Sequence, residues 1–99
     1  MLSSLGTRAR IDLHLHTTRS DGAFSPEETL LKCARGGLDI VALTDHDLVN
    51  DITPGLQRVG DRDLWVIAGA EISGMHEGTE YHLLVYFPGE MPAEFAEFC

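Results

Sequence analysis

The sequence has few basic residues, few cysteines and no long apolar run. Seven Lys and Arg side chains stand against sixteen Asp and Glu, so the 99-residue chain has a formal charge of -9. Because proteins bind nucleic-acid phosphates through Lys and Arg, this balance argues against stable nucleic-acid binding, and also against binding to an anionic membrane. No run of about 18 apolar residues occurs, so we expect no membrane-spanning helix.

The two cysteines, Cys33 and Cys99, do not have the spacing of a metal-binding pair. We expect Cys33 to be a packed free thiol, which favours a reduced, cytoplasmic setting. The N-terminal residues have no apolar core between basic and small residues, so no signal peptide is expected. The apolar fraction of 43% is typical of a globular domain and too high for a disordered chain.

Four segments predict strands, and their order predicts an α/β fold. They are residues 10–16, 38–43, 64–70 and 80–87. The first alternates strictly between polar and apolar residues, whereas the second is nearly continuously apolar, as in a parallel sheet that is buried on both faces. The third is expected to end at Glu71. Residues 48–59 are ambiguous because Pro54 and Gly55 interrupt any helix, and residues 90–99 predict a weak helix at best.

One helix is strongly predicted between the first two strands. Ser25 is suited to the N-cap, Pro26 to the first helical position, and Glu28 completes a capping box. The helix is expected to run to about Arg35, where the pair Gly36-Gly37 ends it.

Histidine and carboxylate side chains gather where the predicted strands end. The alternation of the first strand places Asp12, His14 and His16 on one face, where Asp12 is suited to fix the tautomer of a histidine. Asp21 lies in the loop after the first strand, and the remaining candidates belong to the three later strands or directly follow them; they are Asp45, His46, Glu71 and His82. His82 lies early in its strand, so that strand must run antiparallel or reach the same edge through a bend.

Each candidate also has an ordinary explanation when it is taken alone. A His-x-His pair is commonly solvated, Asp45 and Asp21 suit turns, Glu71 suits a surface strand end, and His82 suits a core histidine. Their shared position at successive strand ends favours a metal site instead, because parallel strands assemble sites at their carboxyl ends. Mixed His and carboxylate ligands suit Zn, Mn or Fe, and a carboxylate can bridge two ions, as in phosphoester hydrolysis. His76 is expected to lie in a loop outside the site.

The motifs resemble the PHP (polymerase and histidinol phosphatase) superfamily over about residues 10–87. They are Asp12-Leu13-His14-Leu15-His16-Thr17, Ser20-Asp21-Gly22, Ser25-Pro26-Glu27-Glu28, Leu43-Thr44-Asp45-His46-Asp47, Gly69-Ala70-Glu71-Ile72-Ser73 and Tyr81-His82-Leu83-Leu84. The resemblance implies a distorted (β/α)7 TIM-like barrel with two or three divalent metal ions at the strand ends. It also implies hydrolysis of a phosphoester by metal-activated water.

The resemblance assigns a role to each candidate. His14 and His16 resemble ligands of one metal, His82 of a second, and Asp21 and His46 of a third, with Glu71 as the bridging carboxylate. Asp45 resembles a partner that does not touch the metal. Asp rather than His at position 21 resembles the branch that contains nucleoside bisphosphate phosphatases and a 5'-3' exoribonuclease, which implies a nucleotide, a small phosphomonoester or a short RNA end as substrate.

The chain is much shorter than a TIM-like barrel, which needs roughly 200–250 residues. We therefore expect residues 10–99 to be a partial PHP domain, the first half of the barrel, after a tail of residues 1–9. The family's later ligands, another His and an Asp-x-His, are absent, so a missing C-terminal half or an oligomer is implied and the isolated chain is expected to be weak or inactive. The alternative is a non-catalytic metal-binding or interaction domain associated with a larger polymerase-like protein.

Overall fold

Five strands and one helix are formed by residues 9–87 and 89, which are the residues that the computed structural model describes. In chain order they are β1 (Ile11–Leu15), α1 (Pro26–Arg35), β2 (Ile40–Leu43), β3 (Gly55–Val59), β4 (Arg62–His76) and β5 (Thr79–Phe87). The predicted α/β class is confirmed at this level. The weak helix predicted for residues 90–99 lies outside the described residues, as does nearly all of the predicted tail. No described helix has the length and apolar character needed to cross a membrane.

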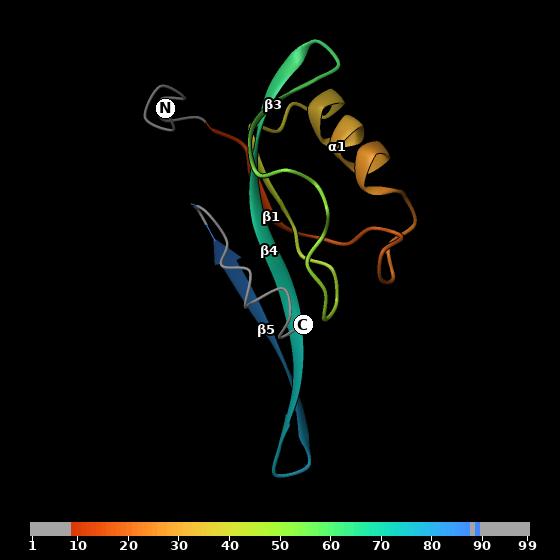
Figure 1. The fold of residues 1–99 in the computed structure, drawn as a ribbon, viewed down its shortest axis with the longest axis vertical. Coiled ribbons are helices and arrows are strands. Elements are labelled where there is room, and N and C mark those ends of the chain that lie inside the picture. The colour runs from red at the N-terminus through yellow and green to blue at the C-terminus, as the bar shows by residue number, and fades with distance from the viewer. Residues whose placement is uncertain (1–8, 88, 90–99) are drawn as a thin grey trace.

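The long strand β4 organises the sheet. β1 pairs with β2, and β2 pairs with β4, in parallel, whereas β3 and β5 both pair with β4 in the antiparallel direction. Trp65 pairs with both β2 and β3, and Ala68 pairs with both β2 and β5. β3 and β5 therefore follow one another along one edge of β4, and β2 occupies the other edge. Figure 1 shows the result, with the β4–β5 hairpin extending beyond the rest of the sheet.

The helix α1 and the covered face of the sheet form the core. Ser25 caps the helix as predicted: its Oγ accepts a hydrogen bond from the Glu28 backbone at 3.1 Å, and the Glu28 carboxylate accepts one from the Ser25 backbone at 3.4 Å. The inward side chains of α1 pack on buried residues of β2 and β4; the cluster comprises Leu30, Cys33, Val41, Leu43, Leu64 and Val66. Cys33 is a buried free thiol, as predicted, and its pKa is raised by burial and then by the negative charge of Asp12.

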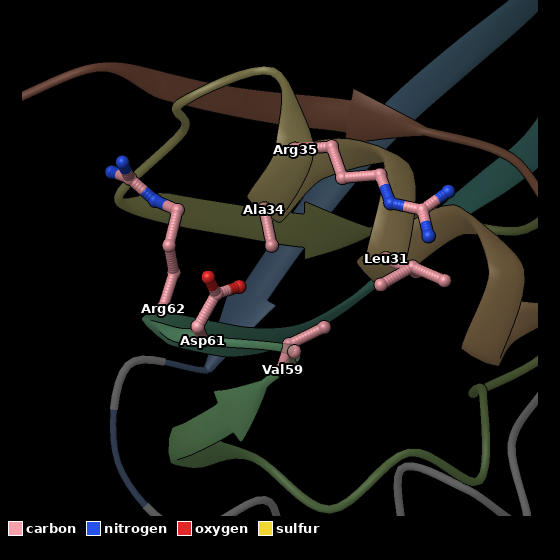
Figure 2. Close-up of a pocket in the computed structure, with 7 residues that line it drawn as sticks. Leu31, Ala34, Arg35, Val59, Asp61 and Arg62 are labelled. Carbon is pink, nitrogen blue, oxygen red and sulfur yellow. The ribbon is translucent and has the colours of Figure 1, made fainter.

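The ambiguous region before β4 contains a strand rather than a helix. Gly55 begins β3 with a φ of 113°, and Gly60 has a φ of 62° at the first position of the two-residue turn into β4. A positive φ is accessible to glycine without steric cost, and a tight hairpin needs one at this position. The turn lies beside the C-terminal end of α1. Between them is a small cavity of about 120 Å³, whose wall includes Arg35 and Arg62 with guanidinium groups that point away from each other (Figure 2).

One prediction about the strands was wrong, and one strand is less regular than its sequence pattern suggests. β4 does not end at Glu71 but continues to His76, because β5 pairs with it along residues 68–76. The strict alternation of β1 is also interrupted: its pairing with β2 shifts by one residue between Asp12 and Leu15. Such an irregularity adds one residue to a strand and turns part of its backbone away from the ladder. His14 and His16 nevertheless reach the same carboxylate oxygen of Glu71, as their predicted shared face requires.

Candidate metal centre

Glu71 is held in place by backbone hydrogen bonds from the segment that follows β2. Its N–H donates to the carbonyl of Asp45 at 3.0 Å, and its carbonyl accepts from the N–H of Asp47 at 2.8 Å. The Asp47 carboxylate then accepts from the N–H of Ser73 at 2.8 Å. This short parallel bridge continues the β2–β4 pairing beyond the end of β2, so Glu71 and His46 lie side by side.

The two carboxylate oxygens of Glu71 contact different histidines. Oε1 lies 2.7 Å from His14 Nε2 and 2.9 Å from His16 Nε2. Oε2 lies 2.8 Å from His82 Nδ1 and 3.7 Å from His46 Nδ1. Glu71 is only 5% exposed, and burial raises its pKa. The hydrogen bonds from His14 and His16, with the charges of His46 and His16, outweigh burial and lower its pKa overall, so Glu71 is ionised at neutral pH.

Asp21 connects the β1 end to the β2 end. Its Oδ1 lies 2.8 Å from His16 Nδ1, and its Oδ2 lies 3.0 Å from His46 Nε2. Gly22 allows this loop to close tightly, because a Cβ at that position would lie 2.3 Å from the His16 carbonyl oxygen. The structure therefore brings Asp21 and His46 together at the same edge, as the sequence predicts.

The six predicted ligands fit divalent metal ions. Their ligand atoms form three groups, each with all atoms within 4.8 Å of one another: His14, His16 and Glu71; His16, Asp21 and His46; and His46, Glu71 and His82. Bonds of about 2.0–2.2 Å to one ion place neighbouring ligand atoms roughly 3 Å apart, which is close to the observed separations. The donor set is imidazole and carboxylate only, which suits Zn, Mn or Fe.

His16 belongs to two of these groups, and its ring nitrogens face different carboxylates. Nε2 faces Glu71 at 2.9 Å, and Nδ1 faces Asp21 at 2.8 Å. A neutral imidazole has one lone-pair nitrogen and one N–H. If Nε2 binds a metal with His14 and Glu71, Nδ1–H donates to Asp21, and such a hydrogen bond fixes the ring orientation of a metal-binding histidine.

His82 reaches the centre from the antiparallel strand β5. It pairs across the hairpin with Ser73, and its Nε2 contacts the Glu80 carboxylate at 3.1 Å. The antiparallel arrangement was one of the two that its early position allowed. His76 is the last residue of β4 and not a loop residue as expected, but it does lie outside the site. Its exposed side chain is 3.9 Å from the adjacent Glu77.

Asp45 organises the loops around the site. It is fully buried, and its carboxylate accepts hydrogen bonds from the Thr17 N–H and hydroxyl at 2.7 and 2.8 Å, from the Ser20 hydroxyl at 2.6 Å and from the Asn50 amide at 2.9 Å. Burial raises the pKa of Asp45, but these hydrogen bonds outweigh it and lower the pKa overall. Thr17 and Ser20 lie within the motifs quoted above, but their contacts with Asp45, like that of Asn50, were not predicted. A hydroxyl or amide in a loop has no distinctive pattern that identifies its hydrogen-bond partner.

Asp12 also acts through the backbone. Its Oδ1 accepts a hydrogen bond from the N–H of His14 at 3.1 Å. This contact orients the main chain at His14. Asp12 therefore contacts the backbone of a histidine, and not a histidine ring as predicted.

Comparison with known proteins shows similarity over the residues that form this site. Residues 12–95 match the family model of the PHP domain. The chain is 36% identical over 75 residues to the 5'-3' exoribonuclease Rnm of Escherichia coli, in an alignment that covers 74% of this chain and 26% of that protein. It is 35% identical over 65 residues to the 3',5'-nucleoside bisphosphate phosphatase of Chromobacterium violaceum, which covers 66% of this chain and 23% of that protein.

A third relative is much larger. The chain is 39% identical over 90 residues to the error-prone DNA polymerase of Mycobacterium tuberculosis, which covers 82% of this chain and 8% of that protein. The alignments with the exoribonucleases span about a quarter of those proteins. Since the family model matches most of the chain and the predicted motifs meet at one sheet edge, the chain belongs to the PHP domain family.

Proposed function

We propose that this chain is the N-terminal, metal-binding part of a PHP-type phosphoesterase that acts on a nucleotide or a small phosphomonoester. The observation that carries the proposal is the position of the Glu71 carboxylate, whose two oxygens face two different pairs of histidines. A buried, ionised carboxylate in this position is suited to bridge two cations.

The residues of this chain would hold and orient the reacting groups. Bound divalent ions would supply Lewis-acid stabilisation of the phosphoryl oxygens and activation of water. His14 and His16 would hold one ion with Glu71, His82 would hold a second, and Asp21 with His46 a third. The charge of -9 also disfavours a phosphate substrate until cations are bound.

We propose further that the described sheet is the first part of a distorted (β/α)7 barrel. Support comes from the parallel order β1-β2-β4, with candidate ligands grouped at the carboxyl ends of β1 and β2 and midway along β4. In a closed barrel, the remaining strands would follow the free edges and supply further ligands at the same end. The relatives are about four times as long as the aligned segment, which agrees with this arrangement.

The proposed substrate class is a nucleoside bisphosphate or the 5' end of a short RNA. Support comes from the activities named for the bacterial relatives and from Asp at position 21, which contacts both His16 and His46. A small substrate also agrees with the few basic residues, because stable binding of long nucleic acids relies on many Lys and Arg contacts.

Metal titration of the purified chain, compared with two histidine variants, tests the proposed site. We expect Mn or Zn to bind, and His14→Ala to weaken binding at least about tenfold because it removes a direct ligand. His76→Ala is the matched control, since His76 is exposed and lies outside the three groups. Calorimetry after removal of bound metal measures both. Equal affinity in the His14→Ala and His76→Ala variants would contradict the assignment.

A phosphatase assay on the same metal-loaded chain tests the catalytic part. We expect little or no turnover of a nucleoside bisphosphate or a 5'-phosphorylated RNA, because catalysis requires reacting groups to be held more precisely than binding does. Robust turnover that disappears in His14→Ala would show that the described ligands suffice.

The polymerase match supports a second candidate, a non-catalytic metal-binding or interaction domain of a larger polymerase-like protein. An activity assay on a longer protein that contains this chain separates the two candidates. After metal loading, the phosphoesterase would hydrolyse a nucleoside bisphosphate, and the non-catalytic domain would not. A metal-loaded longer protein without this activity would favour the second candidate.

A further inference from the structure

Tyr86 is a polar residue on the metal-facing side of the sheet that the proposed function has not used. It lies on β5 four residues after His82, so both side chains are on the same face of the strand. Its hydroxyl donates a hydrogen bond to the Leu13 carbonyl of β1 at 2.6 Å. β5 and β1 are not neighbours, because β4 and β2 lie between them. Tyr86 therefore spans the sheet from one side of the candidate site to the other.

Gly69 of β4 makes room for this crossing. Tyr86 pairs with Gly69 across the hairpin, and a Cβ at position 69 would lie 3.3 Å from Cδ1 of the Tyr86 ring. The same Cβ would lie 2.9 Å from the Val85 carbonyl oxygen and 3.1 Å from the Thr44 methyl group. Any larger residue at position 69 would thus push against the ring.

The carbonyl that Tyr86 contacts belongs to the peptide unit that leads into His14. The N–H of the same peptide unit is that of His14, and it donates to the Asp12 carboxylate at 3.1 Å. The C=O and N–H of a trans peptide point in opposite directions, so Tyr86 and Asp12 hold this plane from its two sides. The peptide lies where the β1–β2 register shifts, and there the regular ladder constrains the backbone least.

We propose that Tyr86, together with Asp12, positions His14 for metal binding by fixing the orientation of the Leu13–His14 peptide. His14 is more exposed than Glu71, with a side-chain exposure of 53% against 7%, so packing alone constrains it little. Tyr86 also sets the separation between β1 and the strand that carries His82. The inference rests on the proposed metal site, and it assigns Tyr86 a positioning role and no contact with a metal ion.

Burial, followed by the charges of Asp12 and Glu71, raises the pKa of Tyr86. The phenol therefore keeps its proton at neutral pH and remains a donor, which agrees with the direction of the hydrogen bond to Leu13.

The test compares Tyr86→Phe with Tyr81→Phe in the full chain. Tyr86→Phe keeps the ring and removes only the hydroxyl. Tyr81 lies on the same strand but on the opposite face and is 55% exposed, and no described hydrogen bond involves its side chain, so it is a matched control. We measure Zn affinity by calorimetry, thermal unfolding without metal, and the visible absorption of Co²⁺ bound in place of Zn, which reports on ligand geometry.

We expect Tyr86→Phe to weaken Zn affinity about 10-fold or more and to change the Co²⁺ spectrum, as loss of partners that orient metal ligands commonly does. Asp12→Ala should act in the same direction, and Tyr81→Phe should match the unmodified chain. Equal affinity and equal spectra in Tyr86→Phe and Tyr81→Phe would overturn the inference, even if Tyr86→Phe unfolds at a lower temperature. Failure of the unmodified chain to bind metal would overturn the proposed site itself, and the inference with it.

Discussion

The two halves of β4 differ sharply in their surroundings. Up to Ala70 the strand lies in the middle of the sheet, with α1 on one face, and Leu64 and Val66 are 0% and 3% exposed. Beyond Glu71 it has β5 on one edge, and Met75 of β4 and Leu83 of β5 are 70% and 64% exposed. Glu71 lies at the junction. One strand therefore contributes to the core along its first half. Its second half, after Glu71, extends with the paired part of β5 as an open arm. The candidate site lies where the two halves meet.

The largest expected effect is the loss of core packing in the buried half. Leu64→Ala should lower the free energy of unfolding by about 2–5 kcal/mol, because it removes buried methyl groups and leaves a cavity. Leu83→Ala should change it by no more than about 0.5 kcal/mol, because the side chain is already largely exposed. Urea denaturation measures both. Similar losses for the two variants would show that the arm is held as tightly as the core.

An intermediate effect is expected at the junction, where Asp45 ties the loops together. Asp45→Ala should cost about 3 kcal/mol, since it leaves the donors of Thr17, Ser20 and Asn50 without their buried acceptor. Asp51→Ala is the control: its ion pair with Arg19 at 2.8 Å is exposed, and such pairs contribute at most about 1 kcal/mol. The same denaturation experiment checks this, and a loss in Asp45→Ala no larger than in the control would contradict it.

The smallest effect is expected at the start of α1, far from the arm. Ser25→Ala should cost about 1 kcal/mol, because the Ser25 hydroxyl accepts a hydrogen bond from the Glu28 backbone. Thermal unfolding of this variant, alone and combined with Glu28→Ala, separates the two contacts of the capping box. No measurable change in Ser25→Ala would mean that Glu28 or solvent is sufficient to satisfy the helix end.

Local chemistry explains which parts of the fold could be predicted. The capping box and the paired glycines define α1 within a few residues, so its limits, Pro26–Arg35, agree with the sequence-based prediction. The grouping of His14, His16 and Glu71 could also be predicted, because parallel strands bring their carboxyl ends to one edge. The structure brings all six candidates together, and metal binding by them stays a prediction.

The other features depend on contacts between distant residues. The extension of β4 beyond Glu71 requires Asp47 and β5 on its two edges, and no sequence pattern near Glu71 predicts these contacts. The irregularity in β1 depends on its register with β2. The hydrogen bond from Tyr86 to Leu13 joins residues 73 positions apart. Hydrophobic periodicity predicts which face of a strand is buried, but it does not predict which polar groups will meet across a sheet.

Asp47 limits which sequences this fold can accept. Its φ of 52° lies in the left-handed region, which Asn, Asp and Gly enter far more readily than β-branched residues do. Its carboxylate also accepts the Ser73 N–H, a contact that Asn can reproduce and Gly cannot. Variation at position 47 is therefore restricted twice, first by backbone conformation and then by the need for an acceptor. Asp and Asn satisfy both requirements, Gly satisfies only the first, and Val or Ile satisfies neither.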